Sequence, residues 1–214
     1  YEMQWSLVGS EMCIRDRISK LCTHSETRDS SIKEMINALD RYYIEGVKTN
    51  RDFLSNILQK KNFHSGLYST SFISEEYPDG YNSYNIEIEN KEILYCVATF
   101  VNFQYLLRAA SISNQLKGFN KTFGNFWRVI DGEKNIDVKI NFNNFNNNYD
   151  VYLLNKHFSI KSNWKIGYPL FSAIIDNKLH YFAINRDGPK FKINHKGGIM
   201  DLIVLSNRHS ELNK

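Results

Sequence analysis

The feature that most constrains this chain is a long segment, residues 91–117, that is apolar on nearly every side of a helix. Its large apolar side chains cover most of the helical circumference instead of one stripe. They are Ile93, Leu94, Val97, Phe100, Val101, Tyr105, Leu106 and Leu107. A helix of this kind is stable only when other structure surrounds it. At about 1.5 Å per residue, the predicted helix is about 40 Å long.

Charged residues mark both ends of this predicted helix. Glu87, Glu89 and Glu92 lie near its N-terminal end, where the helix dipole favours negative charge. Lys117 and Gly118 form a typical stop. The alternative for so apolar a segment is a membrane span, which is not favoured because polar residues interrupt the apolar run too early. Those residues are Asn102, Gln104 and Arg108.

After Gly118 the helical period is lost, and eight short runs of strand-forming residues follow. The predicted strands are residues 125–131, 135–142, 149–155, 157–161, 170–176, 178–184, 189–194 and 199–206. The second run alternates as expected for a strand with one buried face. Its apolar side is Ile136, Val138, Ile140 and Phe142, and its polar side is Asp137, Lys139 and Asn141.

Hairpin-type dipeptides separate several of these runs, which predicts antiparallel neighbours. They are Asp131-Gly132, Asp176-Asn177, Asp187-Gly188 and Gly197-Gly198. A meander that curls around the preceding helix satisfies both patterns, because the helix needs an apolar sleeve and the sheet needs an apolar partner. The predicted fold class is α+β, with the long helix wrapped by an antiparallel eight-stranded β-barrel. In such a barrel Phe100, Tyr105 and Leu107 are expected to fill the interior.

The chain before the long helix predicts a smaller module of helices and one short strand. Residues 27–41 predict an amphipathic helix with Thr27 as its N-cap. Its apolar stripe is Ile32, Met35, Ile36 and Leu39. Tyr42, Tyr43 and Ile44 then favour a short strand.

A second helix of this module is expected to run from Thr49 to Gln59. Thr49 and Asp52 have the spacing of a helix cap. The expected buried stripe is Phe53, Leu54, Ile57 and Leu58. A last helical turn over residues 71–77 precedes the turn dipeptide Asp79-Gly80.

Several segments of this module resemble the C-terminal end of a biotin carboxylase domain. They are Ile18-Ser19-Lys20-Leu21, Ala38-Leu39-Asp40, Gly46-Val47-Lys48-Thr49-Asn50, Phe53-Leu54 and Thr70-Ser71-Phe72-Ile73. A more diffuse similarity to the alpha subunits of propionyl-CoA carboxylase and its relatives continues through the rest of the chain. It rests on Tyr77-Pro78-Asp79-Gly80, the long helix, Trp127-Arg128-Val129 and residues 188–205. In that family a helix inside an antiparallel barrel, the BT domain, contacts the carboxyltransferase subunit.

The resemblance implies where the domains lie. Residues 18–80 correspond to the end of the biotin carboxylase domain, and residues 81–208 to the helix-in-barrel domain. Residues 209–214 are expected to begin a linker to a biotin carrier domain that the chain does not contain. Residues 1–17 match nothing in the family and lack a signal-peptide pattern, so they are expected to be a foreign, adapter-derived segment. The alternative is a divergent N-terminal strand.

The resemblance also implies a function for the parent protein. Such alpha subunits use ATP, Mg²⁺ and bicarbonate to carboxylate biotin, and a carboxyltransferase (beta) subunit then carboxylates an acyl-CoA, with propionyl-CoA the preferred substrate. The family's reactive groups lie upstream of the residues present. The chain is therefore expected to have no catalytic residues, to bind none of these cofactors alone, and to act as a docking module. The implied location is the bacterial cytoplasm, or the mitochondrial matrix in a eukaryote.

Two residues are candidate nucleotide contacts. The resemblance places the backbone around Thr70 and Ser71 at the rim of the adenine pocket of a biotin carboxylase. The alternative is that Thr70 only caps the short helix that follows.

Composition argues against several other functions. The six histidines, His24, His64, His157, His180, His195 and His209, lack the spacing of metal ligands. A net charge of +4 is mild, and the basic residues alternate with apolar ones, so nucleic-acid binding is not indicated. The cysteines Cys13, Cys22 and Cys96 form no disulfide or metal pattern, and Cys96 is expected to be a buried apolar side chain.

A rival interpretation belongs to a different class of protein. A stand-alone binding protein could use the helix-filled barrel to hold an apolar or acyl ligand. Such a carrier requires an open apolar pocket, whereas a docking module requires a filled barrel.

Overall fold

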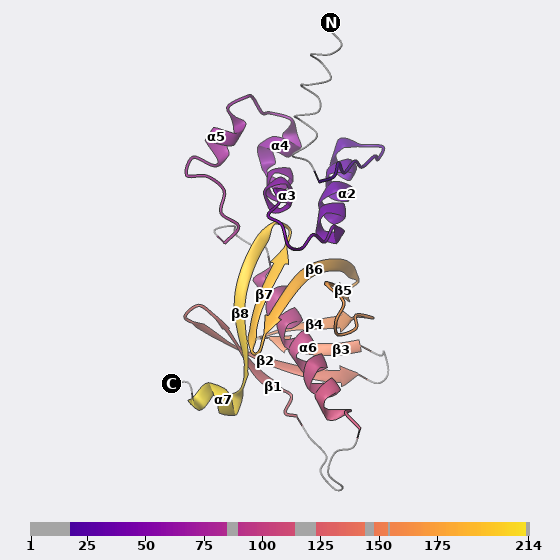
Figure 1. Cartoon of the computed structure of the whole chain (residues 1–214), viewed down its shortest axis with the longest axis vertical. Coiled ribbons are helices and arrows are strands. Elements are labelled where there is room, and N and C mark those ends of the chain that lie inside the picture. Colours follow the sequence, from indigo (N-terminus) through magenta and orange to yellow (C-terminus); the bar gives the residue numbers. More distant parts are fainter. Residues whose placement is uncertain (1–17, 85–89, 114–122, 144–147, 154, 213–214) are drawn as a thin grey trace, which may run out of the picture.

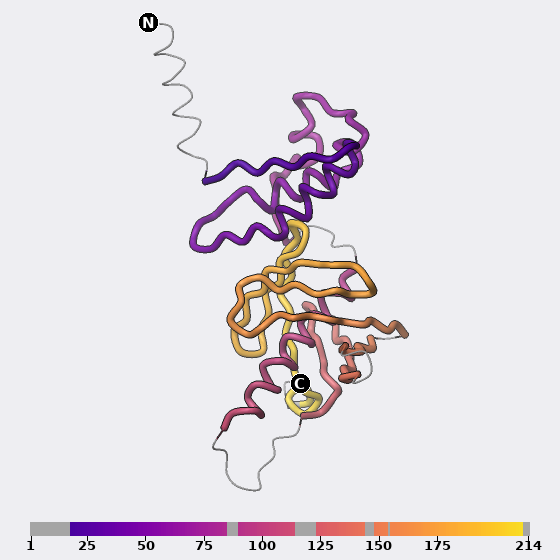
Figure 2. Tube along the Cα trace, turned by 90° about the vertical axis from the view of Figure 1, so that its right-hand side faces the viewer, coloured from indigo at the N-terminus to yellow at the C-terminus, as the bar shows by residue number. Residues whose placement is uncertain are grey.

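A computed structural model of the chain describes residues 18–84, 90–113, 123–143, 148–153 and 155–212. A small helical module lies against one end of a β-barrel, and a long helix runs through the barrel (Figure 1). The tip of the β7–β8 hairpin reaches the helical module in both views (Figures 1 and 2).

Eight antiparallel strands form a closed barrel. They are β1 (Phe126–Asp131), β2 (Lys134–Asn143), β3 (Asn148–Leu153), β4 (Lys156–Lys161), β5 (Leu170–Ile175), β6 (Lys178–Asp187), β7 (Lys190–His195) and β8 (Gly198–Ser206). Each strand pairs with its neighbours in sequence, and β1 pairs with β8 to close the barrel, with Val129 opposite Val204. The eight predicted strands and their antiparallel order are confirmed.

The long helix α6 (Lys91–Ala110) is enclosed by these strands. Residues 94–103 are buried on every side of the helix, as the sequence predicts. Phe100 is 2% exposed, and its ring centroid lies 5.0 Å from that of Tyr149 and 5.6 Å from that of Phe171. The strands contribute a matching set of buried residues, among them Val129, Ile140, Val151, Leu153, Ile160, Phe182, Phe191, Ile193 and Leu202.

The helix is shorter than the sequence predicts. It ends at Ala110, and the backbone N–H of Ser111 donates to the carbonyl oxygens of Leu107 and Arg108. The expected stop at residues 117–118 lies outside the described residues, as do Glu87 and Glu89 before the helix. The helix ends where its side chains leave the barrel.

The side chains near that end correct the predicted filling of the barrel. Tyr105 is only partly buried, and Leu107 is 37% exposed, so the expectation that Leu107 fills the interior is wrong. By length and apolar character α6 is the one described helix that could cross a membrane. More than half of its most apolar window is buried inside the protein, which is typical of a core helix.

Residues with a left-handed backbone conformation (positive φ) form the tight hairpin turns. Asp176 and Asn177 have φ of 47° and 65°, and Gly188 has φ of 55°. The last turn lies one residue earlier than predicted, because Lys196 and Gly197 have φ of 51° and 78° while Gly198 already begins β8.

The predicted alternation in β2 holds for most of the strand. Val138 and Ile140 are buried, and Ile136 packs against the core. Phe142 is an exception, because it lies near the end of the strand and is 46% exposed. Its ring centroid lies 4.9 Å from that of Tyr149.

The helical module contains four helices, α2 (Arg28–Arg41), α3 (Arg51–Gln59), α4 (Lys61–Ser65) and α5 (Phe72–Glu76). Thr27 caps α2 as predicted, because its Oγ1 accepts from the N–H of Ser30 at 3.2 Å. Ile32 and Leu39 are the buried residues of the α2 stripe. The sequence did not predict α4.

Two local predictions in this module are wrong. Residues 42–44 form no strand, and the carbonyl of Tyr42 accepts from Arg51 Nη1 at 3.1 Å instead of pairing with another strand. The N-cap of α3 is Asn50 and not Thr49, and no side chain caps that helix.

The buried face of α3 also differs from the prediction. Ser55 and Asn56 are its buried residues, whereas Leu54 is 40% exposed. Phe53 is partly buried and packs against Tyr77 and Tyr81, with ring centroids 5.2 and 5.0 Å away. The other three residues of the expected stripe, Leu54, Ile57 and Leu58, line a groove instead.

Helix α7 (Asn207–Leu212) follows β8 and packs on the barrel. Arg128 Nη1 of β1 donates to Ser210 Oγ at 3.2 Å, and Ser210 is 6% exposed. The assignment of residues 209–214 to the start of a linker stays a prediction.

The enclosed helix predicts a large difference between two positions of α6. Phe100→Ala should destabilise the chain by about 3–5 kcal/mol, because it leaves a cavity inside the closed barrel. Leu107→Ala should cost less than about 1 kcal/mol, because that side chain is already partly in solvent. Urea unfolding followed by circular dichroism measures both, and equal costs would mean that the barrel does not enclose the middle of α6.

Candidate functional site

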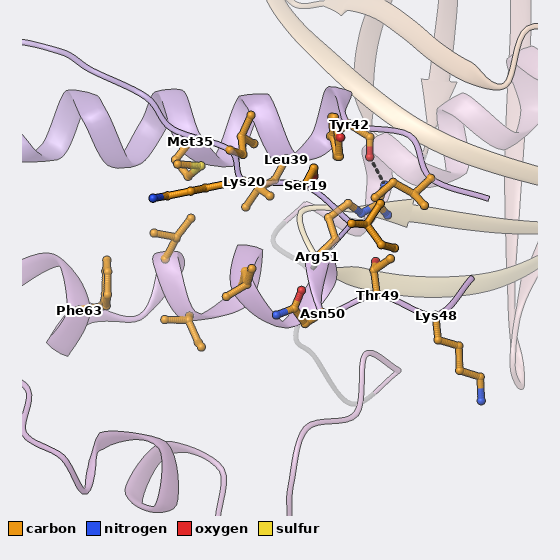
Figure 3. Close-up of a pocket in the computed structure, with 16 residues that line it drawn as sticks. Ser19, Lys20, Met35, Leu39, Tyr42, Lys48, Thr49, Asn50, Arg51 and Phe63 are labelled. Carbon is orange, nitrogen blue, oxygen red and sulfur yellow. Dashed lines mark hydrogen bonds between the residues drawn. The ribbon is translucent and has the colours of Figure 1, made fainter. Parts of the chain in front are cut away.

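A groove of about 650 Å³ lies between α2 and α3 (Figure 3). The segment that begins at Ile18 forms one of its sides. Its apolar lining is Ile18, Leu21, Met35, Leu39, Tyr42, Ile44, Leu54, Ile57, Leu58 and Phe63. Its polar lining is Ser19, Lys20, Lys48, Thr49, Asn50 and Arg51.

The groove does not carry the groups that catalysis needs. Its lining contains no carboxylate and no histidine that could serve as a base for the hydroxyls of Ser19 or Thr49. Lys48 points away from the groove in Figure 3, and Arg51 is engaged with the carbonyl of Tyr42. A partly open apolar groove of this kind is suited to packing against another apolar protein surface.

The two predicted nucleotide contacts lie outside this groove. Thr70 and Ser71 are exposed and precede α5, where Ser71 is the N-cap. Ser71 Oγ lies 2.7 Å from Ser69 Oγ and also hydrogen-bonds the carboxylate of Glu75. These hydrogen bonds engage the Ser71 hydroxyl with its own loop and helix, and the role of Thr70 and Ser71 at the rim of an adenine pocket stays a prediction. The alternative role of Thr70 as a cap is wrong, because Ser71 holds that position.

A second site is the seam between the helical module and the barrel, where the turn Lys196–Gly197 enters the helices. The backbone of this turn is held on three sides. Gln59 Nε2 donates to the carbonyl of Lys196 at 2.8 Å, and Tyr81 OH donates to the carbonyl of Gly197 at 2.8 Å. The N–H of Lys196 donates to Asp40 Oδ1 at 3.1 Å.

Asp52 joins the groove to this seam. Its Oδ1 accepts from Arg51 Nε and Nη2 at 3.0 and 2.8 Å, and its Oδ2 accepts from Asn194 Nδ2 at 2.8 Å. Its backbone carbonyl lies against Gly197, where an added Cβ atom would be only 2.4 Å from that oxygen. Only glycine therefore fits at the tip of the hairpin.

The centre of the seam is a buried pair, Asp40 and His195. Asp40 Oδ2 lies 3.6 Å from His195 Nδ1, and that nitrogen lies 2.9 Å from the carbonyl of Tyr181, to which it donates as Nδ1–H. The side chains are 10% and 7% exposed.

Burial shifts both pKa values in the seam toward the neutral forms. Desolvation raises the pKa of Asp40 to about 6, although the hydrogen bond from Lys196 opposes the shift. Desolvation lowers the pKa of His195 to about 3, and the hydrogen bond to Tyr181 opposes that shift. Both side chains are therefore neutral together over a range below pH 6.

The described residues form no metal-binding cluster, and the buried cysteine is not a reactive thiol. Within the residues that the structure describes, no three His, Cys, Asp or Glu side chains are grouped as a metal site requires. Cys96 is buried, as predicted, and burial raises the pKa of its thiol.

Sequence reasoning missed the seam. Asp40 lies in a segment that resembles the biotin carboxylase family, and Gly197 lies in a predicted turn, but nothing in either segment indicates that they meet. A local signal existed only in Asp40, which is a charged residue directly after the buried Leu39.

The opposed pKa shifts predict a cancellation in the pH dependence of stability. Folded Asp40 keeps a proton that the unfolded chain loses above about pH 4, so Asp40 alone makes stability fall from about pH 4 to 6. Folded His195 lacks a proton that the unfolded chain holds below about pH 6.5, so His195 alone makes stability rise over that range. The two effects oppose each other and largely cancel between about pH 4 and 6.

Single substitutions should expose each effect. Relative to wild type, Asp40→Asn should gain about 1.4 kcal/mol of stability per pH unit between pH 4 and 6, and His195→Asn should lose about as much. Urea unfolding at a series of pH values gives these differences. Parallel pH profiles for wild type and both variants would show that neither group titrates as a buried side chain.

The close approach at Gly197 predicts a second stability effect. Gly197→Ala should destabilise the chain by about 2 kcal/mol or more beyond the matched control Gly132→Ala. Both positions have positive φ, but an added Cβ atom at Gly132 meets nothing within 4 Å. Thermal unfolding of the two variants is the measurement, and equal losses would show that the hairpin tip is not clamped.

Comparison with known proteins assigns both modules. The family model for the propionyl-coenzyme A carboxylase BT domain matches residues 94–214, which contain the buried part of α6, the barrel and α7. The model for the biotin carboxylase C-terminal domain matches residues 16–75, which contain the groove, α2 to α4 and all but the last residue of α5.

Relatives in curated collections match across both modules. The propionyl-CoA carboxylase alpha chain of Ruegeria pomeroyi is 26% identical over 197 residues, covering 91% of this chain and 28% of the relative. The mitochondrial alpha chain of Caenorhabditis elegans is 29% identical over 184 residues, covering 79% and 25%. The human mitochondrial alpha chain is 26% identical over 201 residues, covering 92% and 28%.

The chain thus spans between 25% and 28% of the length of these relatives. The BT-domain model alone covers more than half of the chain, and the barrel with an enclosed helix lies in the matched region. The chain therefore belongs to the family of biotin-dependent acyl-CoA carboxylase alpha subunits of the propionyl-CoA carboxylase type.

Proposed function

We propose that this chain is a non-catalytic assembly module of a propionyl-CoA-type carboxylase. In this role the barrel docks the carboxyltransferase (beta) subunit, and the helical module forms the end of the biotin carboxylase domain. The parent protein would use ATP, Mg²⁺ and bicarbonate to carboxylate biotin. Propionyl-CoA would be the substrate of the partner, in the bacterial cytoplasm or the mitochondrial matrix.

The observation that carries the proposal is the filled interior of the barrel. Leu94, Val97 and Phe100 of α6 are each at most 2% exposed and contact a closed set of strand residues. A carrier of apolar ligands needs its interior for the ligand. A barrel that is filled by its own helix leaves its outer surface and its open ends for recognition.

The groove between α2 and α3 supports the same role for the helical module. Its lining is apolar, and Leu54 and Tyr42 are 40% and 37% exposed although both border it. Exposed apolar surface of this kind marks a contact region. We infer that it packs against further biotin carboxylase structure of the parent protein, where Thr70 and Ser71 stay predicted nucleotide contacts.

Binding to the partner tests this function. The purified chain should bind a propionyl-CoA carboxylase beta subunit in a saturable manner, measured by biolayer interferometry and by co-elution in size-exclusion chromatography. The Ruegeria pomeroyi alpha chain should compete with it, because both would use the same surface of the beta subunit.

Two further assays separate the alternatives. Bicarbonate-dependent ATP hydrolysis by the chain should stay at the background of a buffer blank. Stoichiometric uptake of a fluorescent acyl probe, together with no binding to the beta subunit, would favour the carrier function and contradict the proposal.

A further inference from the structure

Arg186 is unusual among the charged residues of the barrel. It lies on β6, its side chain is partly buried, and its Nε is a buried donor without a hydrogen-bond partner. No carboxylate of the described residues forms an ion pair with it. A partly buried cation of this kind is costly unless another group satisfies it.

Two aromatic rings fix the position of this guanidinium. Its Cζ lies 4.2 Å from the ring centroid of Tyr105 near the end of α6, and 5.7 Å from that of Phe191 on β7. Contacts with the faces of two rings hold a guanidinium in place while its N–H edge can still donate.

The connection between β4 and β5 extends this aromatic surface. Trp164 lies 6.3 Å from Tyr105 between ring centroids, and its Nε1 donates to the carbonyl of Tyr168 at 3.0 Å. Tyr168 is 59% exposed. We call the set Arg186, Tyr105, Trp164 and Tyr168 the Arg186 platform.

The charges of the elements that form the platform are mainly positive. The segment from residue 161 to 169 carries Lys161 and Lys165 and no acidic residue, and Arg108 lies one turn beyond Tyr105 on α6. None of these three cations forms an ion pair among the described residues. Asp187, next to Arg186, is the acidic neighbour in sequence.

We propose that the Arg186 platform is the part of the barrel that receives a carboxylate side chain of the carboxyltransferase subunit. This inference rests on the proposed function, which names the partner. Tyr, Trp and Arg are the residues that dominate binding energy at protein interfaces. The Nε of Arg186 is buried within the fold, so an acidic partner would accept charge-assisted hydrogen bonds from the terminal nitrogens of the guanidinium, and it would complement the local positive charge.

The decisive variant is Arg186→Met, which keeps an unbranched side chain between the rings and removes the charge and the unsatisfied donor. Its affinity for the beta subunit should fall by about tenfold or more. Its melting temperature should stay equal to wild type or rise, because an unpaired buried donor has been removed. Arg186→Lys should bind with intermediate affinity, since it keeps the charge but not the planar fork.

Arg128→Met is the matched control. Arg128 also lies on the barrel, but its Nε and Nη2 already donate to the carboxylate of Asp137 at 2.7 and 3.1 Å. The control removes the same charge from the same kind of element and should change the affinity by less than about threefold. Added salt should weaken binding of wild type more than binding of Arg186→Met.

The outcomes separate the two proposals. If wild type binds the beta subunit and Arg186→Met binds equally well, the platform is not the contact and the docking function stands. If Arg186→Met lowers the melting temperature and weakens binding together, Arg186 has a structural role and the inference is wrong. If wild type does not bind any propionyl-CoA carboxylase beta subunit, the docking function fails and this inference fails with it.

Discussion

The enclosure of α6 is the constraint on which the rest of the structure depends. A helix with apolar residues on all sides cannot leave one face in water, so the strands must close around it completely. Closure requires β1 to pair with β8, and it fixes which residues of each strand face inward. Because the helix fills the interior, contacts with other molecules are restricted to the outer surface of the barrel, its ends and the helical module.

The two modules are linked through an element that also closes the barrel. The β7–β8 hairpin pairs with β1 at its base, and its tip at Lys196–Gly197 is held by Asp40, Gln59 and Tyr81. The seam between the two modules consists of polar groups that are neutral or hydrogen-bonded, and these fix how the modules sit against each other with little apolar contact. The barrel and the helical module are therefore held in a defined relative orientation, while the platform at Arg186 is left for the proposed partner.

The fold could be predicted from the sequence far better than the sites. Period-two runs, hairpin dipeptides and an all-round apolar helix determine the barrel, because these are local signals of burial. Predictions failed where a non-local contact decides the local structure. Residues 42–44 were expected to form a strand, but Arg51 donates to the carbonyl of Tyr42, which a neighbouring strand would otherwise use. Asp40, His195 and Arg186 could not be found, because only the folded chain brings their surroundings together.

The order of the enclosed helix and its sleeve along the chain has a consequence for biosynthesis. The ribosome completes α6 at Ala110, but the last strand of the sleeve ends at Ser206. At the usual rates of translation this delay is on the order of 5 to 20 seconds. During that time the apolar helix of the nascent chain is not yet enclosed by the strands of the barrel. Chaperone binding should therefore be needed most within this interval.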